Sequence, residues 1–139
     1  MSYIFEKDQL YRMPTHFGPS LGPRQGLAGR RYDCLETSRD LMIQATFKAD
    51  KEQLEKLLPP GFSLREPYVI SLSFYYIKDI EWLGGRGYNV FGVSVPATYQ
   101  GQQDTVNDDL LLVLWENMAD PIITGREDLG FAKVYGEIP

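Results

Sequence analysis

Three long runs of β-forming residues constrain the fold most strongly. Tyr68 to Ile80 is dense in aromatic and β-branched residues, and the turn at 84–87, which holds three glycines, leads into a second run from Tyr88 to Tyr99. The third run, Leu110 to Trp115, is continuously apolar, a pattern typical of a strand buried on both sides. In the second run the odd-numbered face is predicted to be core, and the small even-numbered face to lie close to another surface or a ligand.

Two short helices and one more strand are predicted around these runs. Apolar residues alternate in the strand-like segment from Arg30 to Phe47. Asp50 is predicted to cap a helix from Lys51 to Leu58. The second helix is predicted to be capped by Asp120, with Pro121 at its first position and Gly130 at its end. The fold class is therefore α+β, a mainly antiparallel sheet or a barrel or cone with two short helices.

The length and composition predict a single domain. A chain of 139 residues with 43% hydrophobic content is long enough to bury one core. Residues 1–29 are rich in proline and glycine and are predicted to form an extended arm over the domain or over a neighbouring subunit. The alternative is a disordered tail, but the aromatic residues of this segment favour an ordered arm.

Charge and cysteine content exclude several classes of partner and cofactor. A net charge of -5 disfavours nucleic acid or an anionic membrane as the main partner. Cys34 is the only cysteine and His16 the only histidine, so neither a disulfide within the chain nor a Cys/His zinc site is expected. No metal or other cofactor is predicted. Because no apolar signal or membrane span is present, the expected location is the cytoplasm.

Lys133 is the first candidate for chemistry, because it is set into an apolar run. Phe131 and Ala132 precede it, and Val134 and Tyr135 follow it. A lysine attacks a carbonyl only as the free amine, and burial among apolar side chains favours that uncharged form. The alternative is an ordinary lysine on the solvent face of a strand, and spacing alone leaves both interpretations open.

The final third of the chain resembles the signature segment of the acetoacetate decarboxylase family. The spacing from the Gly-Arg-Glu triplet to Lys133 is the most specific part of this resemblance, and further matches follow in order along nearly the whole chain. The segments that carry it are Arg12-Met13-Pro14, Phe17-Gly18-Pro19, Leu58-Pro59-Pro60-Gly61-Phe62, Glu66-Pro67, Tyr88 with Gly92 and Pro96, Leu114-Trp115-Glu116-Asn117, Pro121-Ile122, Gly125-Arg126-Glu127 and Gly130-Phe131-Ala132-Lys133.

The resemblance implies a Schiff-base enzyme on an antiparallel β fold shaped like a cone or barrel, assembled into a large homo-oligomer. It places Lys133 at the position of the nucleophile that attacks a small β-keto acid. Arg30 matches an arginine that could attract the substrate carboxylate, with Arg31 one residue away; a plain surface charge is the alternative. Phe131, Ala132 and Val134 would then be the apolar surroundings of the amine.

Three departures from the family pattern bear on activity. Val134 stands where the family has a second lysine, and a neighbouring cation, as in acetoacetate decarboxylase itself, helps to activate the nucleophile. Val90, counted with the pocket, stands at the family's active-site glutamate, and Leu72 at another acidic position. The chain also resembles only the N-terminal half of family members, so open strand edges would favour a homo-oligomer. Arg126 and Glu127 are predicted to hold the segment together, and a similar structural role is predicted for Glu116.

Two classes of function remain open. The first is a lyase of the acetoacetate decarboxylase type, acting through Lys133 on a small keto acid, with an aldolase- or dehydratase-like reaction on an α-keto acid as its nearest variant. The second is a non-catalytic domain of the same fold that binds a small ligand or serves only in assembly.

Overall fold

The computed structural model describes Lys7, residues 11–12, 20–21 and 30–32, and residues 38–139. The chain divides into two units, Met1–Arg39 with Ile77–Gly87, and Asp40–Tyr76 with Tyr88–Pro139. In chain order the elements are β1 (Tyr11–Arg12), β2 (Ser20–Leu21), β3 (Arg39–Lys48), α1 (Lys51–Glu55), β4 (Phe62–Leu64), β5 (Val69–Ile80), the 3-10 turn η3 (Glu81–Leu83), β6 (Arg86–Gln100), β7 (Thr105–Glu116), α2 (Ala119–Leu129) and β8 (Lys133–Tyr135).

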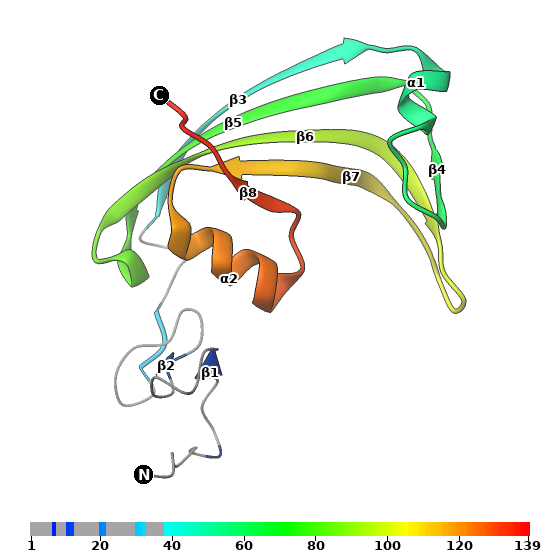
Figure 1. Ribbon diagram of the computed structural model, residues 1–139. Helices are drawn as coiled ribbons and strands as arrows, with labels where there is room; N and C mark the ends of the chain where they lie inside the picture. Colours follow the sequence, from blue (N-terminus) through cyan, green and yellow to red (C-terminus); the bar gives the residue numbers. More distant parts are fainter. Residues whose placement is uncertain (1–6, 8–10, 13–19, 22–29, 33–37) are drawn as a thin grey trace. The chain divides into compact units, whose positions relative to one another are not determined.

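One sheet dominates the described part of the chain. Its strands follow the order β3-β5-β6-β7-β8, and β4 pairs with β6 (Figure 1). β6 and β7 are antiparallel, with a register shift between Val93 and Ser94, whereas β8 runs parallel to β7. The α+β class with two short helices is confirmed. The sheet is mainly antiparallel and stays open, so a closed barrel is not formed by the described residues.

The predicted strands are largely confirmed in the second unit. β5 and β6 match their predicted runs to within two residues, while β7 begins five residues before the predicted Leu110. In β6 the odd-numbered Val95 and Ala97 are buried, but so are Val90 and Pro96 of the even-numbered face. Both faces of this strand therefore contribute to the core.

The first strand differs from its prediction. β3 begins at Arg39 rather than at Arg30, and all ten of its residues are exposed. It is an edge strand with β5 as its neighbour, so its apolar Leu41, Ile43 and Phe47 face solvent in this chain. An exposed apolar edge is the feature that the homo-oligomer prediction requires. The oligomer itself stays a prediction.

The helix boundaries show one confirmed cap and one wrong one. Asp50 caps α1, since its carboxylate accepts a hydrogen bond from the Gln53 N–H at 3.0 Å, although the helix ends three residues before Leu58. α2 begins at Ala119, with Met118 rather than Asp120 at the N-cap. Asp120 lies inside the first turn, where its carboxylate accepts a hydrogen bond from the Thr124 hydroxyl at 3.3 Å. Gly130 ends α2 as predicted, with φ of 73°.

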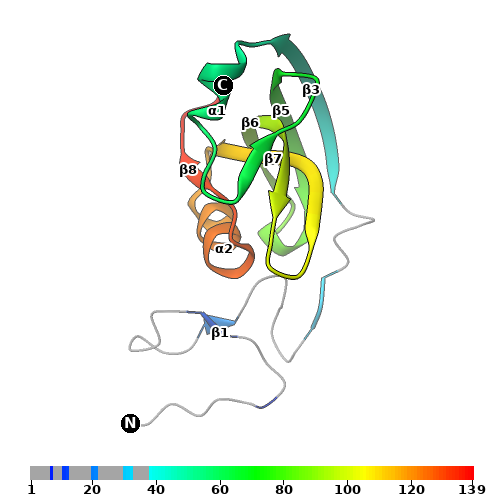
Figure 2. The same ribbon diagram turned by 90° about the vertical axis from the view of Figure 1, so that its right-hand side faces the viewer.

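α2 packs against one face of the sheet, as Figures 1 and 2 show. Its buried residues are Pro121, Thr124 and Gly125. Gly130 and a short connection then return the chain to β8 beside β7. α2 therefore follows the C-terminal end of β7, and Lys133, the first residue of β8, lies beside that same end.

Several predictions fall on residues outside the described ranges. The arm over 1–29 is described only as the antiparallel pair β1 and β2, with Lys7. His16 and Cys34 are not described. The single-domain and cytoplasmic predictions stay predictions. None of the helices in the described ranges is both long and apolar enough to cross a membrane.

Candidate active site

Lys133 is brought to its position by the parallel pairing of β8 with β7. The register places Lys133 beside Leu114 and Tyr135 beside Glu116. Residues two apart in a strand point to the same face, and residues paired across strands share a face. Lys133 and Glu116, although 17 positions apart in the sequence, therefore project from one face of the sheet, the face that α2 covers.

The two side chains form a buried ion pair. The Lys133 Nζ lies 2.8 Å from the Glu116 Oε1, with side-chain exposures of 10% and 1%. The same Nζ donates a hydrogen bond to the main-chain oxygen of Pro121 at 3.2 Å. Mutual attraction of a buried pair is offset by the loss of hydration of both ions. Such a pair adds little stability, but it fixes the position of the amine.

Glu116 is the member of the pair whose hydrogen bonding is incomplete. Its Oε2 is buried and has no hydrogen-bond partner among the described residues. Burial raises the pKa of the Glu116 carboxyl above its ordinary value of 4.5, and the hydrogen bond and charge of Lys133 oppose that rise. A carboxyl with a raised pKa is suited to take a proton from a neighbouring group. Transfer of one proton within the pair yields a free amine beside a neutral acid.

The raised pKa of Glu116 predicts a pH effect on stability. Native Glu116 holds its proton more tightly than the unfolded chain does, so its contribution to stability is complete below about pH 4.5 and falls as the pH rises through the native value. Glu116→Gln removes this titration. Urea unfolding of both proteins from pH 4 to 8 should show the wild type losing stability relative to the variant as the pH increases. A difference that stays constant or grows in the other direction would contradict the assignment.

Gly125 in α2 makes room for the lysine. A Cβ built on Gly125 would lie 2.4 Å from Lys133 Cε, 2.5 Å from Cδ and 2.6 Å from Nζ, closer than real Cβ contacts allow. The lysine side chain therefore runs across the surface of the helix at a point where any other residue would displace it. The glycine of the Gly-Arg-Glu triplet has a steric role.

Gly125→Ala is expected to reduce the rate at which the Lys133 amine reacts with a carbonyl compound about a hundredfold, because a displacement of roughly 1 Å at the reacting atom has that effect. In an unconstrained helix the same change would stabilise the protein by about 1 kcal/mol. Borohydride trapping of a keto acid on Lys133 and urea unfolding measure the two effects, with Ile123→Ala, an exposed position on the same helix, as the control. Trapping at the wild-type rate in Gly125→Ala would show that the lysine tolerates the displacement.

Four hydrogen bonds hold the main chain around Lys133, one of which its own N–H donates to the Phe131 oxygen at 2.8 Å. Arg126 Nη1 donates to the main-chain oxygen of Lys133 at 2.8 Å. The Phe131 N–H bonds the Gly125 oxygen, and the Leu114 N–H bonds the Ala132 oxygen, both at 2.9 Å. Arg126 of α2 is therefore linked directly to the first residue of β8. The Gly-Arg-Glu triplet and Lys133, which have a specific spacing in the sequence, are thus also in direct contact in the structure.

The four predicted pocket residues lie in different places. The Phe131 ring centroid is 5.4 Å from the Lys133 Nζ, although the residue is 45% exposed. Ala132 is exposed, and Val134 pairs with Trp115 on the face of β8 opposite to Lys133. Val90 is buried. Phe131 therefore lies at the amine itself, whereas Val134 does not.

Val90 has a further relation to the site that sequence reasoning missed. In the antiparallel pairing of β6 with β7, Val90 is the direct partner of Glu116. The resemblance places a glutamate at position 90, where this chain has a valine, and the buried Glu116 carboxylate lies beside that position on the neighbouring strand. The signal available in the sequence was a charged residue ending a continuous apolar run. We infer that Glu116 exchanges protons with Lys133, in addition to the structural role predicted for it.

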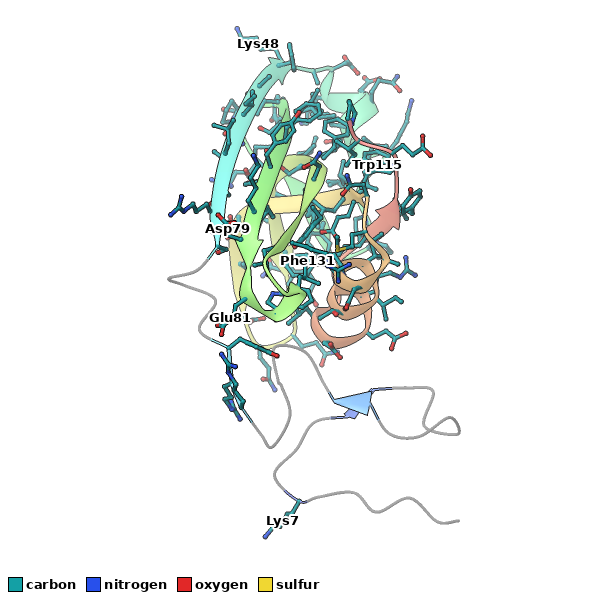
Figure 3. The ribbon with its side chains drawn as sticks, turned by 90° about the vertical axis from the view of Figure 1, so that its left-hand side faces the viewer. Lys7, Lys48, Asp79, Glu81, Trp115 and Phe131 are labelled. Atoms are coloured by element: carbon teal, nitrogen blue, oxygen red, sulfur yellow. The ribbon has the colours of Figure 1, made fainter. Side chains whose placement is uncertain are left out.

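Arg30 belongs to the first unit. It forms an ion pair with Glu81, and its guanidinium lies 5.3 Å from the centroid of the Tyr32 ring. Figure 3 shows Asp79 and Glu81 projecting from the end of β5 and the turn after it. A substrate carboxylate would have to compete with Glu81 for this arginine. Its predicted contact with substrate stays a prediction.

Comparisons with known proteins identify the family. The profile described as acetoacetate decarboxylase (ADC) matches residues 12–139. Among solved structures, the chain is similar to the enduracididine biosynthesis enzyme MppR complexed with the condensation product of pyruvate and imidazole 4-carboxaldehyde, at 17% identity and a TM-score of 0.58, over 72% of this chain and 39% of the other. A comparison with curated proteins finds no match.

Two further structures extend the same likeness. Acetoacetate decarboxylase from Legionella pneumophila matches at 22% identity and a TM-score of 0.55, over 81% of this chain and 44% of its own. An acetoacetate decarboxylase-like enzyme from Sphingomonas wittichii RW1 matches at 18% identity and a TM-score of 0.56, over 69% and 39%. The chain spans about two fifths of the length of these structures and shares their fold. The profile match over residues 12–139 shows that the chain belongs to the acetoacetate decarboxylase family.

Proposed function

We propose that this protein is a lyase that decarboxylates a small β-keto acid through a Schiff base on Lys133. The observation that carries the proposal is the buried pair of Lys133 with Glu116, 2.8 Å apart on the face covered by α2. A lysine and a proton acceptor held within hydrogen-bond reach form the arrangement that nucleophilic catalysis by an amine needs.

Schiff-base formation follows from this pair. The Lys133 ammonium passes a proton to the Glu116 carboxylate, and the freed amine attacks the keto carbon of the substrate. The nitrogen then gives up one proton and the former carbonyl oxygen takes up one, so that a neutral carbinolamine forms. The protonated Glu116 then donates to the hydroxyl group, which leaves as water, and the C=N bond of a cationic iminium remains.

The iminium then accepts the electrons of the breaking bond. The carboxylate departs as CO2, and the electron pair of its C–C bond moves toward the nitrogen to give an enamine. A proton adds to the former α-carbon, and water hydrolyses the new iminium to release the ketone and Lys133. Glu116, with a raised pKa and one oxygen without a hydrogen-bond partner among the described residues, is the group proposed to exchange these protons.

Glu116 also offers a way to activate Lys133 without the second lysine, which is replaced by Val134 in this chain. The resemblance assigns the second lysine of the family the task of disfavouring the charge on the nucleophile. In this chain an acceptor beside the amine is proposed to perform the task differently, by taking the proton inside a dehydrated pair. A neutral pair avoids the cost of burying two ions, which favours it in an apolar site.

An aldol-type reaction on an α-keto acid is the second candidate. The MppR structure named above was solved with a condensation product of pyruvate and an aldehyde. The same iminium could form on pyruvate, and Glu116 could then remove the proton from the methyl carbon to give the nucleophilic enamine. The third candidate, a binding or assembly domain without catalysis, would require neither proton transfer nor a free amine.

Assays with acetoacetate and with pyruvate plus an aldehyde separate the three candidates. Release of CO2 from acetoacetate is expected, with acetone formed in equal amount. Condensation of pyruvate with an aldehyde, without CO2 release from acetoacetate, would favour the aldol reaction. Absence of turnover with both substrates in folded protein would favour the binding domain.

A further inference from the structure

A cavity of about 370 Å³ lies beside the segment that leads into Lys133. Its lining includes Ala97 of β6, Val106 and Leu111 of β7, and Phe131. Cavities of this size lie within the range that accommodates small organic ligands. A keto acid with four carbons, bound at Lys133, would leave most of this volume unused.

Phe131 lies beside both the cavity and the amine, although Lys133 is not among the residues that line the cavity. Phe131 lines the cavity, and its ring centroid lies 5.4 Å from the Lys133 Nζ. Leu111 gives a second connection. A Cβ at Gly92 would lie 3.7 Å from Leu111 and 2.9 Å from Leu114, the residue paired with Lys133. Leu111, which lines the cavity, and Leu114, which pairs with Lys133, therefore lie close to the same point of β6.

We propose that this cavity binds the apolar tail of the keto acid whose carbonyl carbon is attached to Lys133. The inference rests on the proposed function and specifies its substrate class: β-keto acids with an uncharged chain several carbons longer than that of acetoacetate. Burial of each added methylene group is worth a roughly fourfold increase in kcat/KM.

Charge restricts the end of that tail. Asp108 and Asp109 line the cavity and are exposed, and the Asp108 Oδ1 accepts a hydrogen bond from the Asp109 N–H at 2.8 Å. The described residues that line the cavity include no basic side chain. Because consecutive residues of a strand point to opposite faces, one of these carboxylates faces the cavity, and without a neighbouring cation it repels an anionic group. A tail that ends in a second carboxylate is therefore disfavoured.

The test compares rates of Schiff-base trapping by borohydride for acetoacetate, 3-oxohexanoate and 3-oxohexanedioate. The longer neutral acid carries two additional methylene groups and is expected to react roughly 16-fold faster than acetoacetate. The dicarboxylate, of equal chain length, is expected to lose this advantage. Asp108→Asn combined with Asp109→Asn should restore part of it.

Val106→Trp tests the location of the tail. Val106 is 46% exposed at the cavity, so the larger ring can enter the space without disturbing the core. The variant should react with acetoacetate at the wild-type rate and lose the preference for 3-oxohexanoate. Ile43→Trp, at a strand position that is 54% exposed and outside the cavity lining, is the matched control and should keep the preference.

Each outcome decides the inference. Equal wild-type rates for acetoacetate and 3-oxohexanoate would overturn the tail site while leaving the proposed function intact. A preference that survives Val106→Trp, or a variant that slows both acids equally, would also overturn the tail site. No adduct with any keto acid would overturn the proposed function and this inference together.

Discussion

Lys133→Ala is expected to eliminate both turnover and Schiff-base formation. Lys133 is the buried lysine of the described residues, and the mechanism has no second amine to replace it. The fold should survive. An unpaired buried charge costs about 3–5 kcal/mol, but Glu116 has a raised pKa and can neutralise itself by taking a proton. CO2 release measures the first effect, and circular dichroism the second.

Lys51→Ala is the matched control for that experiment. Lys51 is an exposed lysine in α1 that forms an ion pair with Glu55 at 3.7 Å. Its removal should change neither turnover nor covalent trapping, because surface pairs of this kind contribute little. Turnover by Lys133→Ala at the wild-type rate would eliminate Lys133 as the nucleophile.

Glu116→Gln is expected to lower kcat by about 10²- to 10⁴-fold, the range over which a positioned proton-transfer group contributes. Glutamine has nearly the same size and can still accept a hydrogen bond from Lys133, but it accepts no proton. The variant should also lose the part of the pH–rate profile that reports titration of the carboxyl. That loss distinguishes proton transfer from a purely structural role.

Glu127→Gln is the control for the carboxyl change. Glu127 lies on α2 in the same signature segment and is exposed, so its amide variant should be as active as the wild type. If Glu116→Gln kept its kcat within twofold of the wild type, Glu116 would be an ion-pair partner without a role in proton transfer.

Much of the fold could be predicted from local pattern. The aromatic and β-branched runs determined β5 and β6, and Gly130 determined the end of α2 because its φ of 73° is adopted readily by glycine. The start of α2 could not be predicted from capping preference. Asp120 instead bonds Thr124 inside the first turn, a contact that competes with its use as a cap.

The exposure of β3 illustrates a different limit. Its alternating apolar residues predict a strand, and the strand is present from Arg39 to Lys48. Whether such a face is covered depends on what packs against it, which no local pattern specifies. Leu41 and Phe47 are therefore exposed in this chain despite a sequence typical of a buried face.

The candidate site, too, could be predicted from the sequence only in part. The position of Lys133 could be predicted from its apolar neighbours and from its spacing to the Gly-Arg-Glu triplet. Its pairing with Glu116 could not, because it depends on β8 returning parallel to β7 in one particular register. The steric role of Gly125 was hidden for a related reason, since it arises only where α2 crosses the lysine side chain.

The central claim is that Lys133 is a nucleophilic amine, and covalent trapping tests it most directly. The folded protein is incubated with acetoacetate, reduced with borohydride, digested and mapped by peptide mass spectrometry. We expect a single adduct on Lys133 that is absent from Lys133→Ala. An adduct on another lysine, or no adduct in folded wild-type protein, would contradict the claim.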